Sequence, residues 1–187
     1  MGLGRGLAAF AAFLVLTALV AVHGLDSVDR AILDVVQTPH AYWLDLAGSI
    51  VTILGQSEVV GIVALGVAIA WLRARRRDWW IPLLLAVVVA IEVVGKLVIA
   101  QDPPPGELSR SIRFLPFLES PTQYAFPSGH VARVAFLVAA LRWPWIPAMV
   151  LVVVMALTRV YLAEHWPSDV LGGWLLGYPI AAIAKRP

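Results

Sequence analysis

Apolar runs about as long as a membrane is thick recur along this chain and constrain its fold more than any other feature. A helix needs about 20 apolar residues to cross a hydrocarbon core of about 30 Å. Runs near this length occupy about residues 6–24, 57–72, 79–100, 127–142, 146–163 and 168–184. The runs are continuous rather than alternating, which favours helices over a membrane barrel. The sequence therefore predicts an all-α integral membrane bundle of six transmembrane helices, in one domain that covers residues 1–187.

The composition supports a membrane protein and excludes several kinds of site. The chain is 60% hydrophobic and 14% charged, whereas soluble domains are roughly 45–50% apolar and about 25% charged. It has no cysteine, which excludes disulfides, thiolate metal sites and a cysteine nucleophile. The formal charge is only +2 and the basic residues are clustered, so we expect a lipid bilayer around the chain and no nucleic-acid partner.

The segments between the apolar runs differ in character. Residues 27–38 mix charged and apolar residues at helical spacing and end at Pro39, which predicts an interfacial helix. Residues 42–55 form a further apolar segment that is interrupted before the second span. The first run follows Arg5 but lacks a convincing signal-peptide cleavage site, so we interpret it as the first span. A proline-rich loop covers residues 101–126.

The distribution of basic residues predicts the orientation of the chain. In a six-span arrangement one side carries most of them: Arg5, Arg73, Arg75, Arg76, Arg77, Arg142, Lys185 and Arg186. The positive-inside bias places this side, with both termini, in the cytoplasm of a multi-pass protein of the cell membrane. Tryptophans near the span ends, such as Trp43 and Trp80, are typical of interfacial anchors.

Ionisable residues inside or beside the spans gather at the opposite membrane level. They are Lys96, His130, Arg159, His165 and Asp169. At about 1.5 Å per residue, His130 lies roughly 18 Å beyond the inner end of its span, near the outer headgroup boundary. Because ionisable groups are costly in a membrane, these residues are functional candidates. The sequence predicts an extracytoplasmic site that a lipid headgroup can reach.

Two short patterns give this site its chemistry. Pro127, Ser128, Gly129 and His130 open a helix, where free backbone N–H groups and the positive helix terminus favour a bound phosphate. In the second pattern, Asp169 follows His165 by four residues. A carboxylate that accepts from one imidazole nitrogen leaves the other nitrogen free as a nucleophile. The alternative for both histidines is an ordinary structural role.

These residues resemble the type-2 phosphatidic acid phosphatase family, which shares its active site with vanadium haloperoxidases. The signature Pro-Ser-Gly-His is complete at residues 127–130. The signature Ser-Arg, five residues, His, three residues, Asp is complete except that Thr158 replaces the serine. The signature Lys, six residues, Arg-Pro begins at Lys96, but Pro103 stands in place of its arginine.

The resemblance implies a role for each matching residue. His165 is the expected nucleophile and forms a phosphohistidine, Asp169 orients it, and His130 is the general acid. Lys96, Ser128, Gly129 and Arg159 are expected to bind the phosphoryl oxygens. The scheme requires no metal and no cofactor.

The arginine that is absent at Pro103 raises the question of what replaces it. Arg133 lies on roughly the same helical face as His130, three residues further on, and is the first candidate. Arg110 and Arg113, in the loop between the first two signatures, are the alternatives. A structural role is also open for Arg133, as the partner of an acid such as Glu92 or Glu164. Glu92 could equally pair with Lys96 within its own helix.

The expected function is a membrane lipid phosphatase that acts on the phosphomonoester or pyrophosphate of an isoprenoid or glycerolipid. Two alternatives are a lipid phosphotransferase and a non-catalytic lipid-binding or transport relative with a decayed site.

Overall fold

The computed structural model describes residues 3–114 and 123–184, and all regular secondary structure in these ranges is helical. The α-helices are α1 (Leu3–Ala21), α2 (Asp26–Val36), α3 (Tyr42–Thr52), α4 (Ser57–Arg73), α5 (Leu85–Val98), α6 (Gly129–Ala140), α7 (Trp145–Tyr161) and α8 (Pro167–Ala184). Three short 3-10 turns join them: η1 (Ile53–Gly55), η2 (Ile81–Leu84) and η3 (Gly106–Leu108). The expected all-α fold is confirmed.

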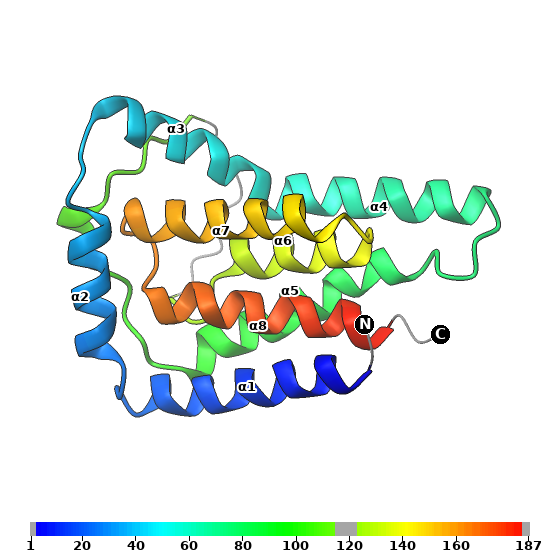
Figure 1. The fold of residues 1–187 in the computed structure, drawn as a ribbon, viewed down its shortest axis with the longest axis horizontal. Coiled ribbons are helices and arrows are strands. Elements are labelled where there is room, and N and C mark those ends of the chain that lie inside the picture. Colours follow the sequence, from blue (N-terminus) through cyan, green and yellow to red (C-terminus); the bar gives the residue numbers. More distant parts are fainter. Residues whose placement is uncertain (1–2, 115–122, 185–187) are drawn as a thin grey trace.

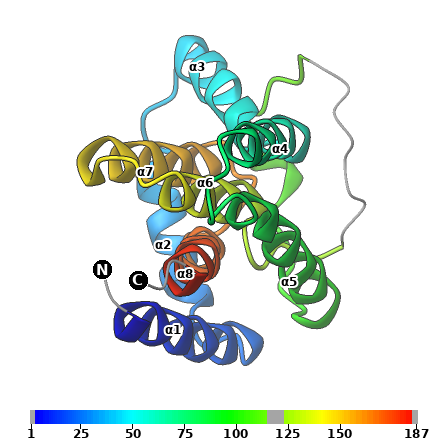
Figure 2. The same cartoon turned by 90° about the vertical axis from the view of Figure 1, so that its right-hand side faces the viewer.

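Most of the helices lie along one direction (Figure 1). Helices α1, α4, α5, α6, α7 and α8 follow the long axis, while α2 crosses one end of the bundle. The connection between α4 and η2 lies at the opposite end, where both chain ends are drawn. Seen end-on in Figure 2, α6 lies in the middle, surrounded by α4, α5, α7 and α8.

Small residues allow the two central helices, α6 and α8, to approach closely. A Cβ atom added at Gly177 would run into the carbonyl oxygen of Ala132, and one at Gly173 would run into that of Ser128. Only glycine fits at such positions. The remaining surface of α6 is also covered, since Val131 and Phe136 are fully buried. Helix α6 is therefore the core of the bundle, and its first turn is fixed by its neighbours.

The expected count of six membrane spans is not confirmed. Among the described residues, two stretches are long and apolar enough to cross a bilayer, Gly4–Ala21 and Ile81–Val98. The pair Tyr42–Gly55 and Ser57–Arg73 gives a third span if the two helices count as one bent element. The apolar helices α6 and α7 are shorter, at 12 and 17 residues. A 12-residue helix rises only about 18 Å, less than the hydrocarbon core.

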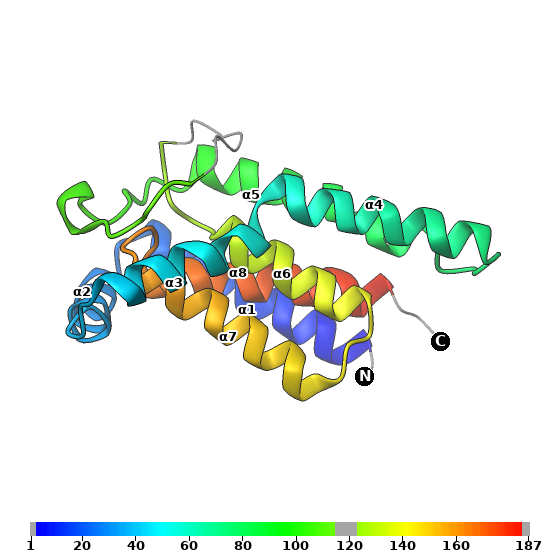
Figure 3. The same ribbon diagram turned by 90° about the horizontal axis from the view of Figure 1, so that it is seen from above.

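The break between α3 and α4 lies in the middle of the bundle. These helices follow one another with a bend of 42° at Gly55 and Gln56 (Figure 3). The backbone of Gly55 packs against His130 of α6, so that an added Cβ would lie 2.9 Å from the His130 Cβ. The bend therefore brings polar groups of α3 and α4 to the first turn of α6.

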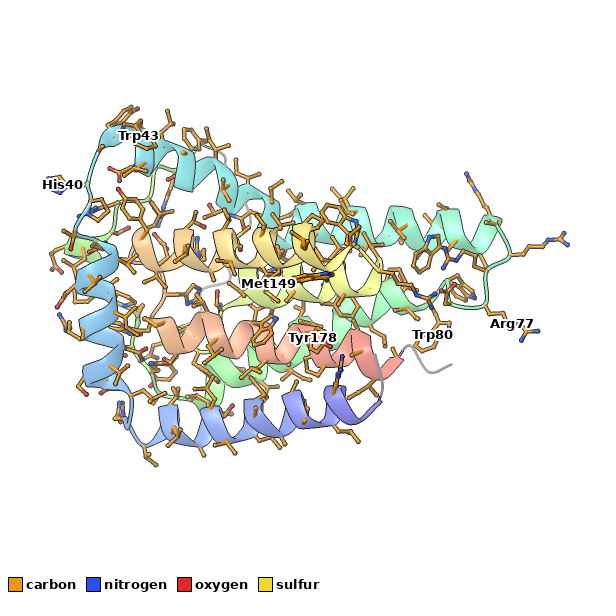
Figure 4. All side chains as sticks on the ribbon, in the orientation of Figure 1. His40, Trp43, Arg77, Trp80, Met149 and Tyr178 are labelled. Carbon is orange, nitrogen blue, oxygen red and sulfur yellow. The ribbon has the colours of Figure 1, made fainter. Side chains whose placement is uncertain are left out.

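Aromatic and basic side chains mark the two ends of the molecule (Figure 4). Trp43 lies at the end formed by α2 and α3, while Trp80 and Arg77 lie at the other end. At that second end Arg76 donates to both carboxylate oxygens of Asp78, at 2.9 and 2.7 Å. The basic connection lies at the end of the bundle toward which α1 begins and α8 ends. The cytoplasmic location of that end remains a prediction.

Candidate active site

A polar cavity of about 360 Å³ lies toward the end of the bundle that α2 crosses. Its walls come from the α3–α4 break, α5, α6, the segments on either side of residues 115–122, and the α7–α8 connection. Six of the expected site residues line it: Lys96, Arg113, His130, Arg133, Arg159 and His165. Groups that are distant in the sequence therefore meet in one hollow.

His165 and Asp169 form the expected pair across the start of α8. The Nδ1 atom of His165 lies 3.2 Å from Oδ2 of Asp169, and the backbone N–H of Trp166 donates to the same oxygen at 2.9 Å. Asp169 is fully buried, so its carboxylate is held in one position. With Nδ1 bound to the carboxylate, Nε2 of His165 remains free for chemistry at the cavity.

The protonation of His165 suits a nucleophile. This residue lies in the connection between α7 and α8. Burial is the main cause that lowers the pKa of His165 well below its ordinary value of 6.5, and the charges of Arg159 and Lys96 lower it further. The imidazole is therefore neutral at neutral pH, as nucleophilic attack requires.

The first turn of α6 is tied directly to this pair. The backbone N–H of Ser128 donates to the carbonyl of Asp169 at 2.9 Å. Within the described residues, the Ser128 hydroxyl and Nε2 of His130 are buried without a hydrogen-bond partner. Buried polar atoms normally have partners. Two such atoms at a helix N-terminus therefore fit a bound ligand with several oxygens, such as a phosphate.

Arg159 contributes a cation from the last turn of α7. Its Nη2 lies 3.6 Å from Oε2 of Glu164, while its Nε is buried without a partner among the described residues. The backbone N–H groups of Glu164 and His165 both donate to the carbonyl of Arg159, at 3.0 and 3.2 Å. The local turn therefore holds the backbone of Arg159 next to that of His165, and both side chains line the cavity.

Glu92 of α5 connects two further cations. Its Oε1 lies 3.3 Å from Nζ of Lys96, and its Oε2 accepts a hydrogen bond of 2.7 Å from Nη1 of Arg133. Nε of Arg133 donates to the carbonyl of Gly55 at 3.0 Å. Both structural pairings that the sequence left open are therefore present. The Glu92 carboxylate also packs against Gly129, where an added Cβ would collide with it.

The other two candidate arginines occupy different places. Arg113 lines the cavity. Arg110 does not, because its guanidinium donates to the carbonyls of Pro39 and Gln37, each at 3.0 Å. Arg110 is thus engaged with the backbone after α2, away from the residues that line the cavity. Pro103 lines the cavity, so the position of the signature's arginine carries no positive charge in this cavity wall.

No candidate metal centre accompanies these residues. In residues 3–114 and 123–184, no three His, Asp or Glu side chains are placed to hold a metal ion. The cavity offers cations and N–H donors instead. Such groups can neutralise the charge that develops on a transferring phosphoryl group.

The sequence did not predict the polar contacts at Ser168, the residue next to the His165–Asp169 pair. Asp29 of α2 is 3% exposed and accepts hydrogen bonds from Ser168, the neighbour of Asp169. Gln101 donates to the Ser168 hydroxyl at 3.1 Å. Neither residue stands in a recognisable motif. The only available signal was that Asp29 shares a helical face with the apolar residue Leu33.

Comparisons with known proteins identify the family of this chain. The model of the PAP2 superfamily matches residues 79–186. An undecaprenyl-diphosphatase of Sulfolobus acidocaldarius is 35% identical over 119 residues, 60% of this chain. The match covers 56% of that relative, so the chain spans about half of its length. Phosphatidylglycerophosphatase B of Bacillus subtilis is 27% identical over 195 residues, 94% of this chain and 91% of the relative.

The fold has a counterpart among solved structures. The crystal structure of a transmembrane PAP2-type phosphatidylglycerolphosphate phosphatase from Bacillus subtilis superposes with a TM-score of 0.78 at 24% identity. The superposition covers 96% of this chain and 94% of that one. This likeness shows the helical fold, and the family model covers more than half of the sequence. The chain belongs to the PAP2 superfamily.

Proposed function

We propose that the protein is a membrane phosphatase that hydrolyses the phosphate or diphosphate group of a lipid through a phosphohistidine. One observation carries this proposal: the buried His165–Asp169 pair opens onto a cavity lined by Lys96, Arg133 and Arg159. A nucleophile with a fixed tautomer and a cationic wall are the two requirements of metal-free phosphoryl transfer.

The reaction proceeds in two steps, formation and hydrolysis of the phosphohistidine. In the first, Nε2 of His165 bonds to phosphorus while the bond between phosphorus and the leaving oxygen breaks. His130, in its protonated form, gives that oxygen a proton. In the second, water attacks phosphorus as neutral His130 accepts its proton, and the bond to His165 breaks. The products are inorganic phosphate and either the lipid alcohol, from a phosphomonoester, or the lipid monophosphate, from a diphosphate.

The cations hold the phosphoryl oxygens during both steps. Lys96 and Arg159 occupy the positions of the family's phosphate ligands, together with Ser128 and Gly129 at the start of α6. Arg133 supplies the positive charge that is absent at Pro103, with its Nε and Nη1 held by Gly55 and Glu92. Arg113 faces the same cavity from the loop side.

The proposed substrate is an isoprenoid diphosphate or a glycerolipid phosphate, presented from the outer leaflet. The names of the relatives support a lipid substrate, since one is an undecaprenyl-diphosphatase and another a phosphatidylglycerophosphatase. Val89 and Val93 of α5 give the cavity an apolar wall beside its charged residues. The positive-inside bias supports an extracytoplasmic site.

The test is phosphate release from a panel of lipid phosphates by the purified protein and by His165→Ala. We expect the wild-type protein to release phosphate and the variant to lose both turnover and the acid-labile phosphoenzyme. Wild-type rates in His165→Ala would refute the mechanism. Radiolabelled phosphate that appears on a second lipid rather than in water would identify a phosphotransferase instead.

A further inference from the structure

The connection that carries His165 is held at both ends by one helix, α2. Before the connection, the side chain of Gln37, just after α2, donates from Nε2 to the carbonyl of Tyr161 at 2.9 Å. After it, the backbone N–H of Ser168 donates to Oδ1 of Asp29 at 2.8 Å. The nucleophile lies between these two fixed points.

The two contacts belong to a single stripe along α2. Asp29, Leu33 and Gln37 follow one another at intervals of four residues, which places them on one helical face. Eight residues of helix span about 12 Å, enough to reach both ends of the connection. Leu33 has no exposed surface and packs in one apolar cluster with Ala163 and Val170, which lie before and after His165.

Asp29 acts on the start of α8 as a cap supplied by another helix. Its carboxylate accepts from the N–H and the hydroxyl of Ser168, at 2.8 and 2.6 Å, and lies 3.4 Å from Nε2 of Gln101. The first N–H groups of a helix have no partner within it, and a carboxylate there also interacts favourably with the helix dipole. The next residue is Asp169, which orients His165.

Gln37 makes a second tie from the same side chain. Its Nε2 also donates to the carbonyl of Leu108 in η3 at 3.1 Å. One amide thus connects the end of α7 to η3, three residues before the cavity-lining residue Ser111. The side chain of Gln101 contacts Asp29, and the backbone carbonyl of Gln101 accepts from the backbone N–H of Ala125, just before the start of α6.

We propose that α2 is a brace for the nucleophile, with Asp29 and Gln37 as positioning residues that act through Asp169 and His165. The proposal rests on the proposed function, because it assumes that His165 attacks phosphorus. Attack requires the nitrogen to be held in line within a few tenths of an ångström, and a displacement of about 1 Å can cost about a hundredfold in rate. Neither residue lines the phosphate cavity, so their effect is on alignment rather than on binding.

The experiment compares kcat, KM and inhibition by inorganic phosphate for Asp29→Ala, Gln37→Ala and the matched control Asp34→Ala. Asp34 is exposed on the same helix. We expect Asp29→Ala to lower kcat at least tenfold and Gln37→Ala at least threefold. KM and the inhibition constant of phosphate should change less than twofold, because the cations of the cavity remain in place. Asp34→Ala should keep both kinetic constants.

A conservative variant of Asp29 separates its effect on the alignment of His165 from its effect on packing between α2 and α8. Asp29→Asn keeps an oxygen that accepts from the Ser168 N–H, and its amide can donate to the Ser168 hydroxyl. We expect it to recover most of the kcat that Asp29→Ala loses. If Asp29→Ala does not fold, Gln37→Ala and Asp29→Asn decide the question. Two results would then contradict the proposed role of α2. One is a kcat of Gln37→Ala within twofold of wild type, and the other is a kcat of Asp29→Asn below a tenth of wild type.

Other outcomes are equally decisive. A wild-type kcat in both Asp29→Ala and Gln37→Ala contradicts the proposal, and so does a rise of KM and of the phosphate inhibition constant in step with the loss of kcat. His165→Ala serves as the reference. If the wild-type protein itself releases no phosphate, the proposed function fails. If only His165→Ala is inactive, the function stands and the brace alone is wrong.

Discussion

Glu92 pairs with two of the cationic residues that are candidates for phosphate binding. It bridges Lys96 and Arg133 at 3.3 and 2.7 Å, so two phosphate-binding candidates share one buried carboxylate. A buried charge is tolerated only with partners, and removal of one partner is strongly destabilising. Arg133 therefore combines a structural role with the proposed catalytic one, and the two must be separated by experiment.

We expect Arg133→Ala to lower kcat/KM at least tenfold, which corresponds to about 1.4 kcal/mol of transition-state stabilisation. The double variant Glu92→Gln with Arg133→Gln removes both charges and should fold better than the single variant while remaining as slow. Steady-state kinetics and thermal unfolding in detergent measure the two effects. Arg77→Ala, at the opposite end of the molecule, is the control. A loss of less than threefold in a folded Arg133→Ala protein would leave Lys96 and Arg159 as the working cations.

His130 allows a test of the proposed general acid. His130→Ala should slow hydrolysis of a lipid phosphate at least a hundredfold but that of an activated aryl phosphate much less, because a good leaving group needs no proton. Parallel measurement of kcat with both substrates gives the answer. Equal losses with the two substrates would remove His130 from the acid role.

At the scale of elements, the site depends on how closely α8 approaches α6. Ser128 at the start of α6 donates to the carbonyl of Asp169 in α8, so a shift between these helices would move both halves of the site. Gly173 and Gly177 set their separation. The packing of the two central helices therefore determines the geometry of the phosphate site.

We expect Gly177→Ala to lower stability by about 1–3 kcal/mol, because the new methyl group would meet backbone atoms of Ala132 that cannot move aside cheaply. Gly66→Ala is the matched control, since a Cβ atom there has nothing within 4 Å. Thermal unfolding in detergent should show a lower midpoint for Gly177→Ala only. Equal midpoints for both variants would mean that α8 can shift without cost.

At the scale of the whole molecule, the two ends have different chemistry. One end carries the cavity and α2, and the other carries the basic α4–η2 connection and both chain ends (Figure 1). Trp43 and Trp80 lie near opposite ends (Figure 4), as expected for anchors at two membrane surfaces. This polarity underlies the proposed orientation.

Single cysteines can test the orientation because the chain has none of its own. Gln123→Cys should react with a membrane-impermeant maleimide added to intact cells, and Arg76→Cys should react only after the cells are opened. Gln123 is exposed beside the cavity, and Arg76 lies in the basic connection. The reverse labelling pattern would place the site in the cytoplasm.

The sequence alone determined the class of fold and named most of the candidate residues that line the cavity. Continuous apolar runs leave a helical membrane bundle as the solution, because lipid offers the backbone no hydrogen bonds. The pair His165 and Asp169 could be predicted because four residues separate them, so their contact is local. The boundaries of α4 and α8 also followed closely from the ends of the apolar runs.

The tertiary structure decided which distant groups meet, because contacts between helices depend on packing rather than on spacing along the chain. Gln37 and Tyr161 are 124 residues apart, and Asp29 and Ser168 are 139 apart, so nothing local relates them. The same holds for Arg133, whose partners Glu92 and Gly55 come from two other parts of the fold. Arg110 was placed near the phosphate by its position in the loop alone, whereas packing directs it to the backbone carbonyls after α2.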